Sequence, residues 1–297
     1  MHSSGQLTVS YASVRLEEIL KRLRDGAQPD AKANLERFGI TARQSYGWSV
    51  PALRDLAKEV GQDHTLAQQL WATGVLDARI LASLVDEADR VTPRQMERWA
   101  RDFDSWAVCD ACCLNLFDRT PYAHAKIRAW SGRKEEFVKR AAFALLAAVA
   151  VHDGDVSDEA LTGFFPLIER EAGDARNFVK KAVSWALRQI GKRNPRLRAA
   201  AMACAERIAS QGTVSARFVA TDALRELQSE AVEKRQTAKK APRASGPNGS
   251  SRRAKAPARP RAKAKPRPPA SRARAKAPSP AKARTAPGRP SRSGRRS

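Results

Sequence analysis

The sequence of 297 residues predicts an all-α protein, a solenoid of stacked helix pairs followed by a disordered basic tail. Apolar residues recur at three- and four-residue spacings, and no segment shows the alternation typical of a strand. Comparable helices return at intervals of roughly 30 to 45 residues, the period of two-helix repeat units. Charged and apolar residues also change in frequency abruptly near residue 233. Periodicity alone leaves an irregular helical domain open as the alternative.

Capping and breaking residues mark the predicted helix boundaries along the chain. Thr92 and Pro93 combine an N-cap with proline at the first helical position, and Thr120-Pro121 repeats this pattern. Gly191 ends the last strongly periodic segment. The expected helices cover residues 14–24, 51–60, 77–88, 94–103, 106–117, 122–130, 137–151 and 178–190.

Positive charge is concentrated at the C-terminal end of the chain. The 64 residues from Lys234 onward hold 22 Lys and Arg and no Asp or Glu, which leaves 33 basic and 31 acidic residues before them. This segment holds 11 of the 17 prolines and no Trp, Phe, Tyr, Leu, Ile or Val. Because it cannot bury enough apolar surface to offset its ordering entropy, we predict disorder. We expect a helical-repeat domain over 1–233 and a Lys/Arg/Ala/Pro-rich tail over 234–297.

The remaining composition narrows the class of protein. Nothing approaches 18 consecutive apolar residues, and the first residues, MHSSGQLTVSYASVRLEE, lack the apolar core of a signal peptide. We therefore expect a cytoplasmic protein that does not enter a membrane. The cysteines have no second C-x-x-C pair and no nearby histidine, so we expect core residues, no metal site and no cofactor. These cysteines are Cys109, Cys112, Cys113 and Cys204.

Two segments of the expected central helices could carry chemistry. Trp106 and Asp110 are four residues apart and project from one helix face. A carboxylate beside an indole suits a planar cationic group, although an isolated pair of this kind is more often a core Trp with a surface Asp. Arg140 precedes an alanine-rich run, so a tightly packed environment is expected. The alternative for Arg140 is a side chain that extends to solvent.

A third segment, in the helix expected over 178–190, places two cations around an aromatic ring. Lys181, Trp185 and Arg188 share one helix face by their three- and four-residue spacings. A stacking surface flanked by cations suits a nucleic-acid backbone. Taken alone, the pattern does not distinguish this role from an ordinary solvated face.

These segments resemble one protein family. The run FVKKAVSWALRQIGKRNP resembles the signature of the bacterial DNA alkylation repair glycosylases built from HEAT-like repeats, the AlkD-like family. Further matches follow in the same order: YGWSVPALRDLAKEV at 46–60, LW and RILA elements near 71–82, SWAVCD at 105–110 and FVKRAA at 137–142. Together the matching segments span roughly residues 30–230, most of the predicted domain.

The resemblance implies a DNA glycosylase that removes N3- and N7-alkylated purines from duplex DNA, working as a monomer at the nucleoid. Two positions depart from the family pattern. Phe38 stands where family members carry a tyrosine, so the ring is kept and the hydroxyl is lost, and Ala107 stands where an aspartate is frequent. The site residues implied by the resemblance are Trp106, Asp110, Arg140 and Trp185.

The chemistry of this reaction suits those residue types. An N3- or N7-alkylated purine is already cationic and leaves as a neutral base, so no strong general acid is required. The difficult species is the oxocarbenium-like sugar, which the Asp110 carboxylate can stabilise while orienting water. Trp106 and Trp185 would bracket the damaged nucleotide, and Arg140 would hold a flanking phosphate. With no lysine assigned as nucleophile, we expect a monofunctional enzyme.

Two other classes of protein stay open from the sequence. A non-catalytic helical-repeat protein that binds DNA or RNA would keep the fold without the reaction, since repeat folds host many functions. A protein-interaction scaffold would use the same solenoid, but the basic tail argues against it. The presence of the complete Trp, Asp, Arg and Trp set favours the enzyme.

Overall fold

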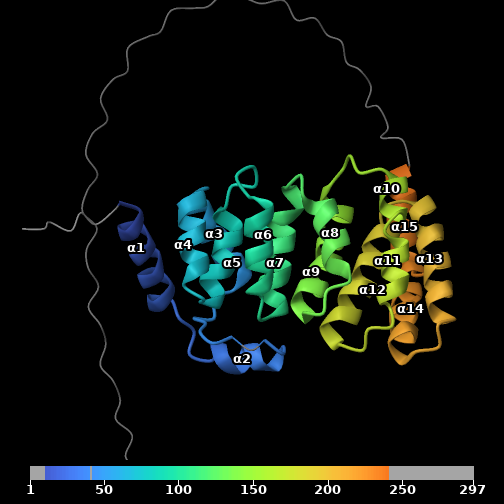
Figure 1. Ribbon diagram of the computed structural model, residues 1–297, viewed down its shortest axis with the longest axis horizontal. Coiled ribbons are helices and arrows are strands. Elements are labelled where there is room, and N and C mark those ends of the chain that lie inside the picture. The colour runs from blue at the N-terminus through green and yellow to red at the C-terminus, as the bar shows by residue number, and fades with distance from the viewer. Residues whose placement is uncertain (1–10, 41, 241–297) are drawn as a thin grey trace, which may run out of the picture. The chain divides into compact units, whose positions relative to one another are not determined.

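The computed structural model describes residues 11–40 and 42–240, and every regular element among them is helical (Figure 1). The all-α prediction is therefore confirmed. In chain order the helices are α1 (Tyr11–Asp25), α2 (Ala31–Arg37), α3 (Val50–Val60), α4 (His64–Ala72), α5 (Leu76–Val85), α6 (Pro93–Arg101), α7 (Trp106–Asn115), the 3-10 helix η1 (Phe117–Arg119), α8 (Ala123–Ser131), α9 (Glu136–His152), α10 (Asp158–Thr162), α11 (Phe165–Glu171), α12 (Asn177–Gly191), α13 (Pro195–Ala209), α14 (Val214–Leu227) and α15 (Glu230–Lys240).

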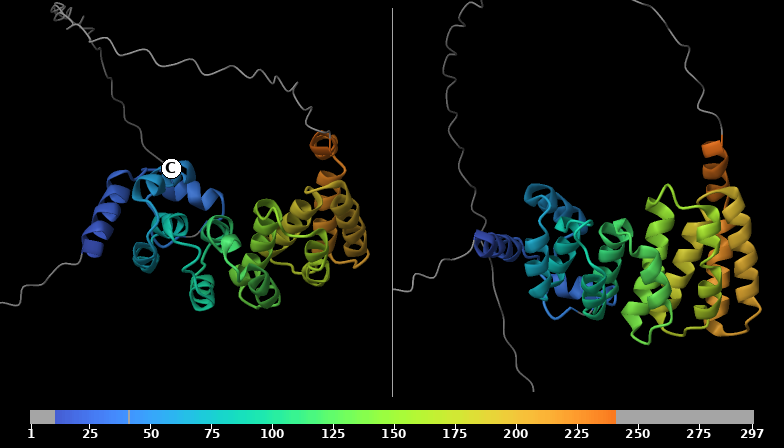
Figure 2. Two further views of the ribbon diagram at one scale, coloured as in Figure 1. Left: turned by 90° about the horizontal axis from the view of Figure 1, so that it is seen from above. Right: turned by 45° about the horizontal axis from the view of Figure 1, so that its top comes forward.

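Successive helices stack in two layers (Figures 1 and 2). Helices α5, α7, α9, α12 and α14 form one layer, because each packs against the next in this order. The other layer contains α4, which packs on α5, as well as α8 on α9 and α13 on both α12 and α14. This alternation of layers is the stacking expected of a solenoid of helix pairs. Among the described residues, no helix is both long enough and apolar enough to cross a membrane.

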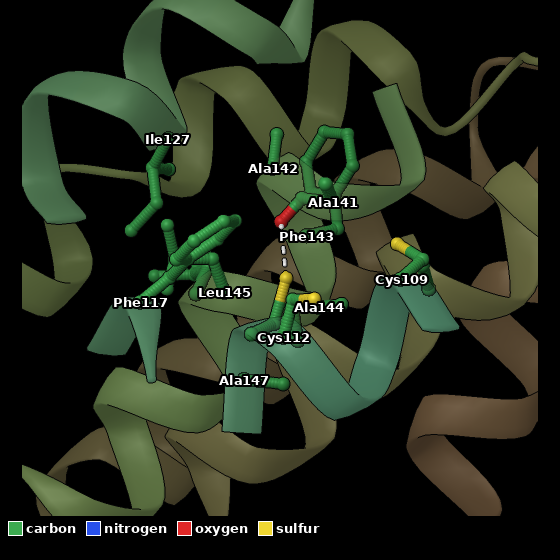
Figure 3. Packing of buried hydrophobic residues seen from close by; sticks show 14 of the residues in the cluster. Cys109, Cys112, Phe117, Ile127, Ala141, Ala142, Phe143, Ala144, Leu145 and Ala147 are labelled. Carbon is green, nitrogen blue, oxygen red and sulfur yellow. Dashed lines mark hydrogen bonds between the residues drawn. The ribbon is translucent and has the colours of Figure 1, made fainter. Parts of the chain in front are cut away.

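Helix α9 forms the centre of the core. Its residues from Ala141 to Ala150 are buried, and the helix packs against α7, α8 and α12. The small alanine side chains allow α7 to approach closely, and Figure 3 shows cysteines of α7 against these alanines. The Sγ of Cys113 lies 3.5 Å from the Ala141 carbonyl oxygen, and the Sγ of Cys109 lies 3.6 Å from that of Phe137. The cysteines are core residues, as the sequence predicts.

A buried carboxylate fixes the loop before α3. Asp77, at the start of α5, accepts hydrogen bonds from the backbone N–H groups of Tyr46 at 2.7 Å and Trp48 at 2.8 Å. It also accepts one from the Ser45 hydroxyl at 2.8 Å. Gly47 has a φ of +78°, which glycine adopts without strain. The anchored loop holds the N-terminal segment that carries α2 near the first repeats.

The capping predictions have mixed outcomes. The Thr92 side chain accepts from the Gln95 N–H and starts α6 at Pro93, as expected. At Thr120-Pro121 the prediction is wrong, because α8 begins at Ala123. The Thr120 hydroxyl instead donates to the Phe117 carbonyl oxygen at 2.8 Å and closes η1. The threonine therefore caps the preceding turn.

The expected domain boundary at 233 needs a correction. Helix α15 continues to Lys240, with Val232 and Gln236 buried against the preceding repeat. The side-chain amide of Gln236 donates to the Gly191 carbonyl oxygen at 3.0 Å, which satisfies an acceptor at the end of α12. Helical structure therefore extends past the composition change. The rest of the predicted tail, residues 241–297, lies outside the described residues.

Candidate active site

One cleft of about 680 Å³ contains every site residue that the sequence predicts. It lies where the end of α2 and the residues after it meet the N-terminal parts of α7 and α9 and the face of α12 from Asn177 to Arg188. The partial positive charge of helix N-termini favours anionic ligands at such a place. The predicted residues in its lining are Phe38, Trp106, Asp110, Arg140, Lys181, Trp185 and Arg188. Sequence reasoning misses four lining residues, which are Arg37, Gly39, Asn177 and Phe178.

Asp110 and Arg140 form a bidentate ion pair inside this cleft. The Arg140 Nε lies 2.9 Å from Asp110 Oδ1, and its Nη2 lies 2.7 Å from Oδ2. The third guanidinium nitrogen donates to the Phe178 carbonyl oxygen at 2.6 Å. The two side chains are only 15% (Asp110) and 9% (Arg140) exposed. The alternative of an arginine extending to solvent is therefore wrong, because Arg140 is buried and bonded at all three nitrogens.

Burial and the ion pair act in opposite directions on the Asp110 carboxyl. Burial raises the pKa of Asp110 above its ordinary value, and the charge and hydrogen bonds of Arg140 oppose this rise without cancelling it. Among the described residues, Arg140 is the only ionic partner of this carboxylate. A carboxylate has about four lone-pair sites, and the bidentate pair occupies two of them. Asp110 therefore keeps acceptor capacity toward the cleft.

Trp106 connects the N-terminal segment to the repeats. Its indole Nε1 donates to the Phe38 carbonyl oxygen at 3.1 Å, across 68 positions of sequence. Phe38 is 65% exposed, so it lies at the rim of the cleft. Gly39 has a φ of +69°, and a Cβ there would lie 3.5 Å from the ring of Phe178. A turn with this conformation brings the segment close to α12.

The two predicted cations of α12 differ in their surroundings. Arg188 contacts both Asp222 and Glu226 of α14, and Glu226 also accepts from Lys192 at 2.7 Å. Lys181 is exposed and forms no ion pair with the part of the chain that the structure describes. The predicted pair of free cations around Trp185 is therefore reduced to one, because acidic residues of the next repeat neutralise the other. Sequence periodicity contains no signal for these partners.

The family model of the DNA alkylation repair enzymes matches residues 19–227. The chain belongs to the DNA alkylation repair enzyme family. The match covers all the helices that line the cleft, which confirms the resemblance seen in the sequence motifs. No characterised protein with a curated description matches the chain.

Two solved structures are similar to this family member, to different degrees. One is a protein of a family related to the HEAT-like repeat DNA glycosylases, described as having affinity for branched DNA structures. It has a TM-score of 0.59 at 16% identity, over 65% of this chain and 82% of that chain. The solenoid prediction is thereby confirmed as a HEAT-like repeat fold, and the irregular helical alternative is excluded. A designed armadillo repeat protein bound to a (KR)4 peptide has a TM-score of 0.33 at 14% identity, over 76% of this chain and 88% of that chain. A score this low does not indicate a shared fold.

Proposed function

We propose that this alkylation repair family member is a monofunctional DNA glycosylase, which hydrolyses the N-glycosidic bond of N3- and N7-alkylated purines in duplex DNA. The observation that carries the proposal is the Asp110 carboxylate, which lies inside a cleft walled by Trp106 and Trp185 and has one ionic partner among the described residues. The resemblance implied this residue set, and the fold gathers it from α7, α9 and α12.

The main requirement of the proposed hydrolysis is a negative charge close to the sugar. The alkylated base carries a positive charge, so cleavage of the N-glycosidic bond releases it as a neutral molecule. Positive charge then develops on the sugar, and a carboxylate near C1′ stabilises it. Water adds to C1′ and gives up a proton, which leaves an abasic site. Asp110 is suited to both tasks, since its unused acceptor sites can face the sugar and the attacking water.

The walls of the cleft suit a cationic base. An indole face attracts a planar cation, and the attraction grows when water is excluded. Trp106 and Trp185 line the same cleft from α7 and α12, so a nucleotide between them would contact an aromatic surface on either side. A neutral purine would gain less from these faces. This difference favours alkylated over undamaged purines.

The exposed cations supply contacts to the DNA backbone. Lys181 lies on the cleft lining, and so does Arg37 at the end of α2. The tail predicted from composition adds phosphate-directed affinity that is independent of sequence. Because the proposed substrate is duplex DNA, we infer that the protein works at the nucleoid in the cytoplasm, and we propose that it acts as a monomer.

Release of the modified base from methylated duplex DNA tests the proposal. The protein in excess should release 7-methylguanine and leave abasic sites, which alkali converts into strand breaks. Strand breaks formed without alkali would show a lyase step and contradict the monofunctional assignment. No base release by protein that saturates the duplex would overturn the proposal.

A DNA-binding role without catalysis is the second candidate. It is favoured by one observation, since both Asp110 oxygens are already bonded to Arg140. The relative with affinity for branched DNA structures suggests the ligand for this role. Tighter binding to a four-way junction than to a duplex of equal length, together with absent base release, would support it over the glycosylase.

A further inference from the structure

We propose that Arg140 is a positioning residue, which holds the Asp110 carboxylate in place and ionised while DNA is bound. This inference rests on the proposed function and replaces the phosphate contact that the resemblance implied for Arg140. It follows from where the guanidinium is buried and what it already binds.

All three nitrogens of the Arg140 guanidinium are already bonded, which leaves few donors for a phosphate. Its Nε and Nη2 are bonded to the two oxygens of Asp110, and its Nη1 to the carbonyl oxygen of Phe178. Arg140 as a whole is only 7% exposed. A side chain that binds a DNA phosphate must instead reach the DNA backbone at the protein surface. The carbonyl bond ties the side chain to α12 as well as to α7, so the guanidinium is fixed from two helices.

Moving Arg140 to a phosphate would disable the carboxylate that the reaction needs. Asp110 would stay buried without an ionic partner among the described residues, and such a carboxyl takes up a proton. The other ionisable groups around the pair cannot replace Arg140 as the cation beside Asp110. The thiols of Cys109 and Cys113 carry no positive charge, and burial raises the pKa of Cys113 well above its ordinary value. The remaining cations of the cleft are Arg37, Lys181 and Arg188.

Two of these cleft cations can take the phosphate role without such a loss. Arg37 and Lys181 are exposed and form no ion pair within the described part of the chain. Releasing either from its present surroundings leaves no buried charge behind. The buried Arg140 therefore holds the Asp110 carboxylate, and the exposed cations bind the DNA backbone.

The salt dependence of duplex binding separates the two roles. Each phosphate contact contributes about 0.9 to the slope of log affinity against log salt. We expect Arg140→Gln to keep the wild-type slope, and the matched variant Lys181→Gln, from the same cleft, to lower it by about 0.9. A slope lowered by about that amount in Arg140→Gln would overturn the proposal.

A carboxyl titration tests the positioning role itself. In the full chain labelled with ¹³C-aspartate, Asp110→Asn identifies the Asp110 signal. Arg140→Gln should raise the pKa of Asp110 by about one unit or more, Arg140→Lys by less, and Lys181→Gln should leave it unchanged. An unchanged Asp110 pKa in Arg140→Gln would overturn the proposal.

A third measurement needs no variant of Arg140 to fold. The Nε–H signal of Arg140 in the wild-type chain should keep its chemical shift when duplex DNA is added, because the bond to Asp110 persists. Disappearance of that bonded signal on DNA would contradict the inference. All three measurements proceed without excision, so a wild-type protein that releases no base would refute the proposed function and leave the assignment of Arg140 to be decided separately.

Discussion

Two carboxylates of consecutive helices, Glu97 of α6 and Asp110 of α7, show how differently the same interaction can be used. Glu97 accepts from the indole of Trp130 at 2.9 Å, from Arg133 at 2.9 Å and from Lys126 at 3.1 Å. Burial acts against its ionised form, but these donors outweigh it and lower the pKa of Glu97 to about 2. Asp110 has one donor residue among the described part of the chain, and its pKa is raised.

The difference lies in how many of the carboxylate's acceptor sites the protein itself fills. Glu97 is surrounded by donors from α8 and the residues after it, so it clamps two repeats together. Asp110 is equally part of an inter-repeat pair, yet its remaining acceptor sites face a cleft. A saturated carboxylate stabilises the fold, whereas an unsaturated one beside a cleft is free to interact with a substrate.

Replacing Asp110 should have the largest effect on function. Asp110→Asn keeps the shape and removes the charge, so single-turnover excision of 7-methylguanine should fall by about 100-fold or more. Duplex binding should stay close to wild type, whereas the melting temperature should fall, because the buried Arg140 loses its ionic partner. Near wild-type rates in this variant would refute the catalytic role of Asp110.

Replacing Glu97 should lower the stability of the protein and leave the excision rate of the folded fraction unchanged. Glu97→Gln leaves Lys126 and Arg133 with weaker partners, and we expect a loss of about 2 kcal/mol in the free energy of unfolding at pH 7. Because the pKa of Glu97 is lowered in the fold, its contribution is present above its ordinary pKa and is lost as pH falls toward about 2. Chemical denaturation at several pH values should show the variant and wild type converging in acid. A reduced excision rate in the folded fraction would break the contrast with Asp110.

Trp185 extends the comparison to aromatic residues. It is partly exposed in the cleft, whereas Trp130 is fully buried. Trp185→Ala should lower excision about tenfold with a modest loss of stability, while Trp130→Ala should lose about 3–5 kcal/mol of stability. The two variants should be compared by thermal melting and single-turnover kinetics. A core-like loss of stability in Trp185→Ala, with unchanged kinetics, would identify Trp185 as a structural residue.

Removing the tail should have the smallest effect on chemistry. The chain should be shortened after residue 240, because α15 packs on the last repeat and must be kept. The shortened protein should bind duplex DNA less tightly at low salt, and its slope of log affinity against log salt should fall by about 0.9 for each phosphate that the tail neutralises. Its excision rate at saturation should be unchanged. An unchanged salt slope would show that the tail does not bind DNA.

The sequence predicts faces of helices well and partners between helices poorly. Spacing places Lys181, Trp185 and Arg188 on one face, and the structure finds all three in one cleft. The same spacing cannot show that Asp222 and Glu226, a repeat further on, engage Arg188. Such pairs depend on the register between stacked repeats, which local periodicity does not encode.

Two further features of the molecule are beyond prediction for the same reason. The hydrogen bond from Trp106 to the Phe38 carbonyl crosses 68 positions and defines the rim of the cleft. Helix α15 continues to Lys240 through a segment whose composition indicates disorder, because Gln236 finds an acceptor on Gly191. Both features depend on contacts between residues far apart in the sequence, and composition does not show which residues meet.

The pH dependence of single-turnover excision tests the central claim most directly, because Asp110 must act in its ionised form. Since burial raises its pKa, the rate should fall in acid at a higher pH than for an exposed aspartate. The residual rate of Asp110→Asn should lack this acidic limb, and circular dichroism should show both proteins folded over the range. A wild-type rate that stays constant until the protein unfolds, or the same limb in Asp110→Asn, would contradict the account.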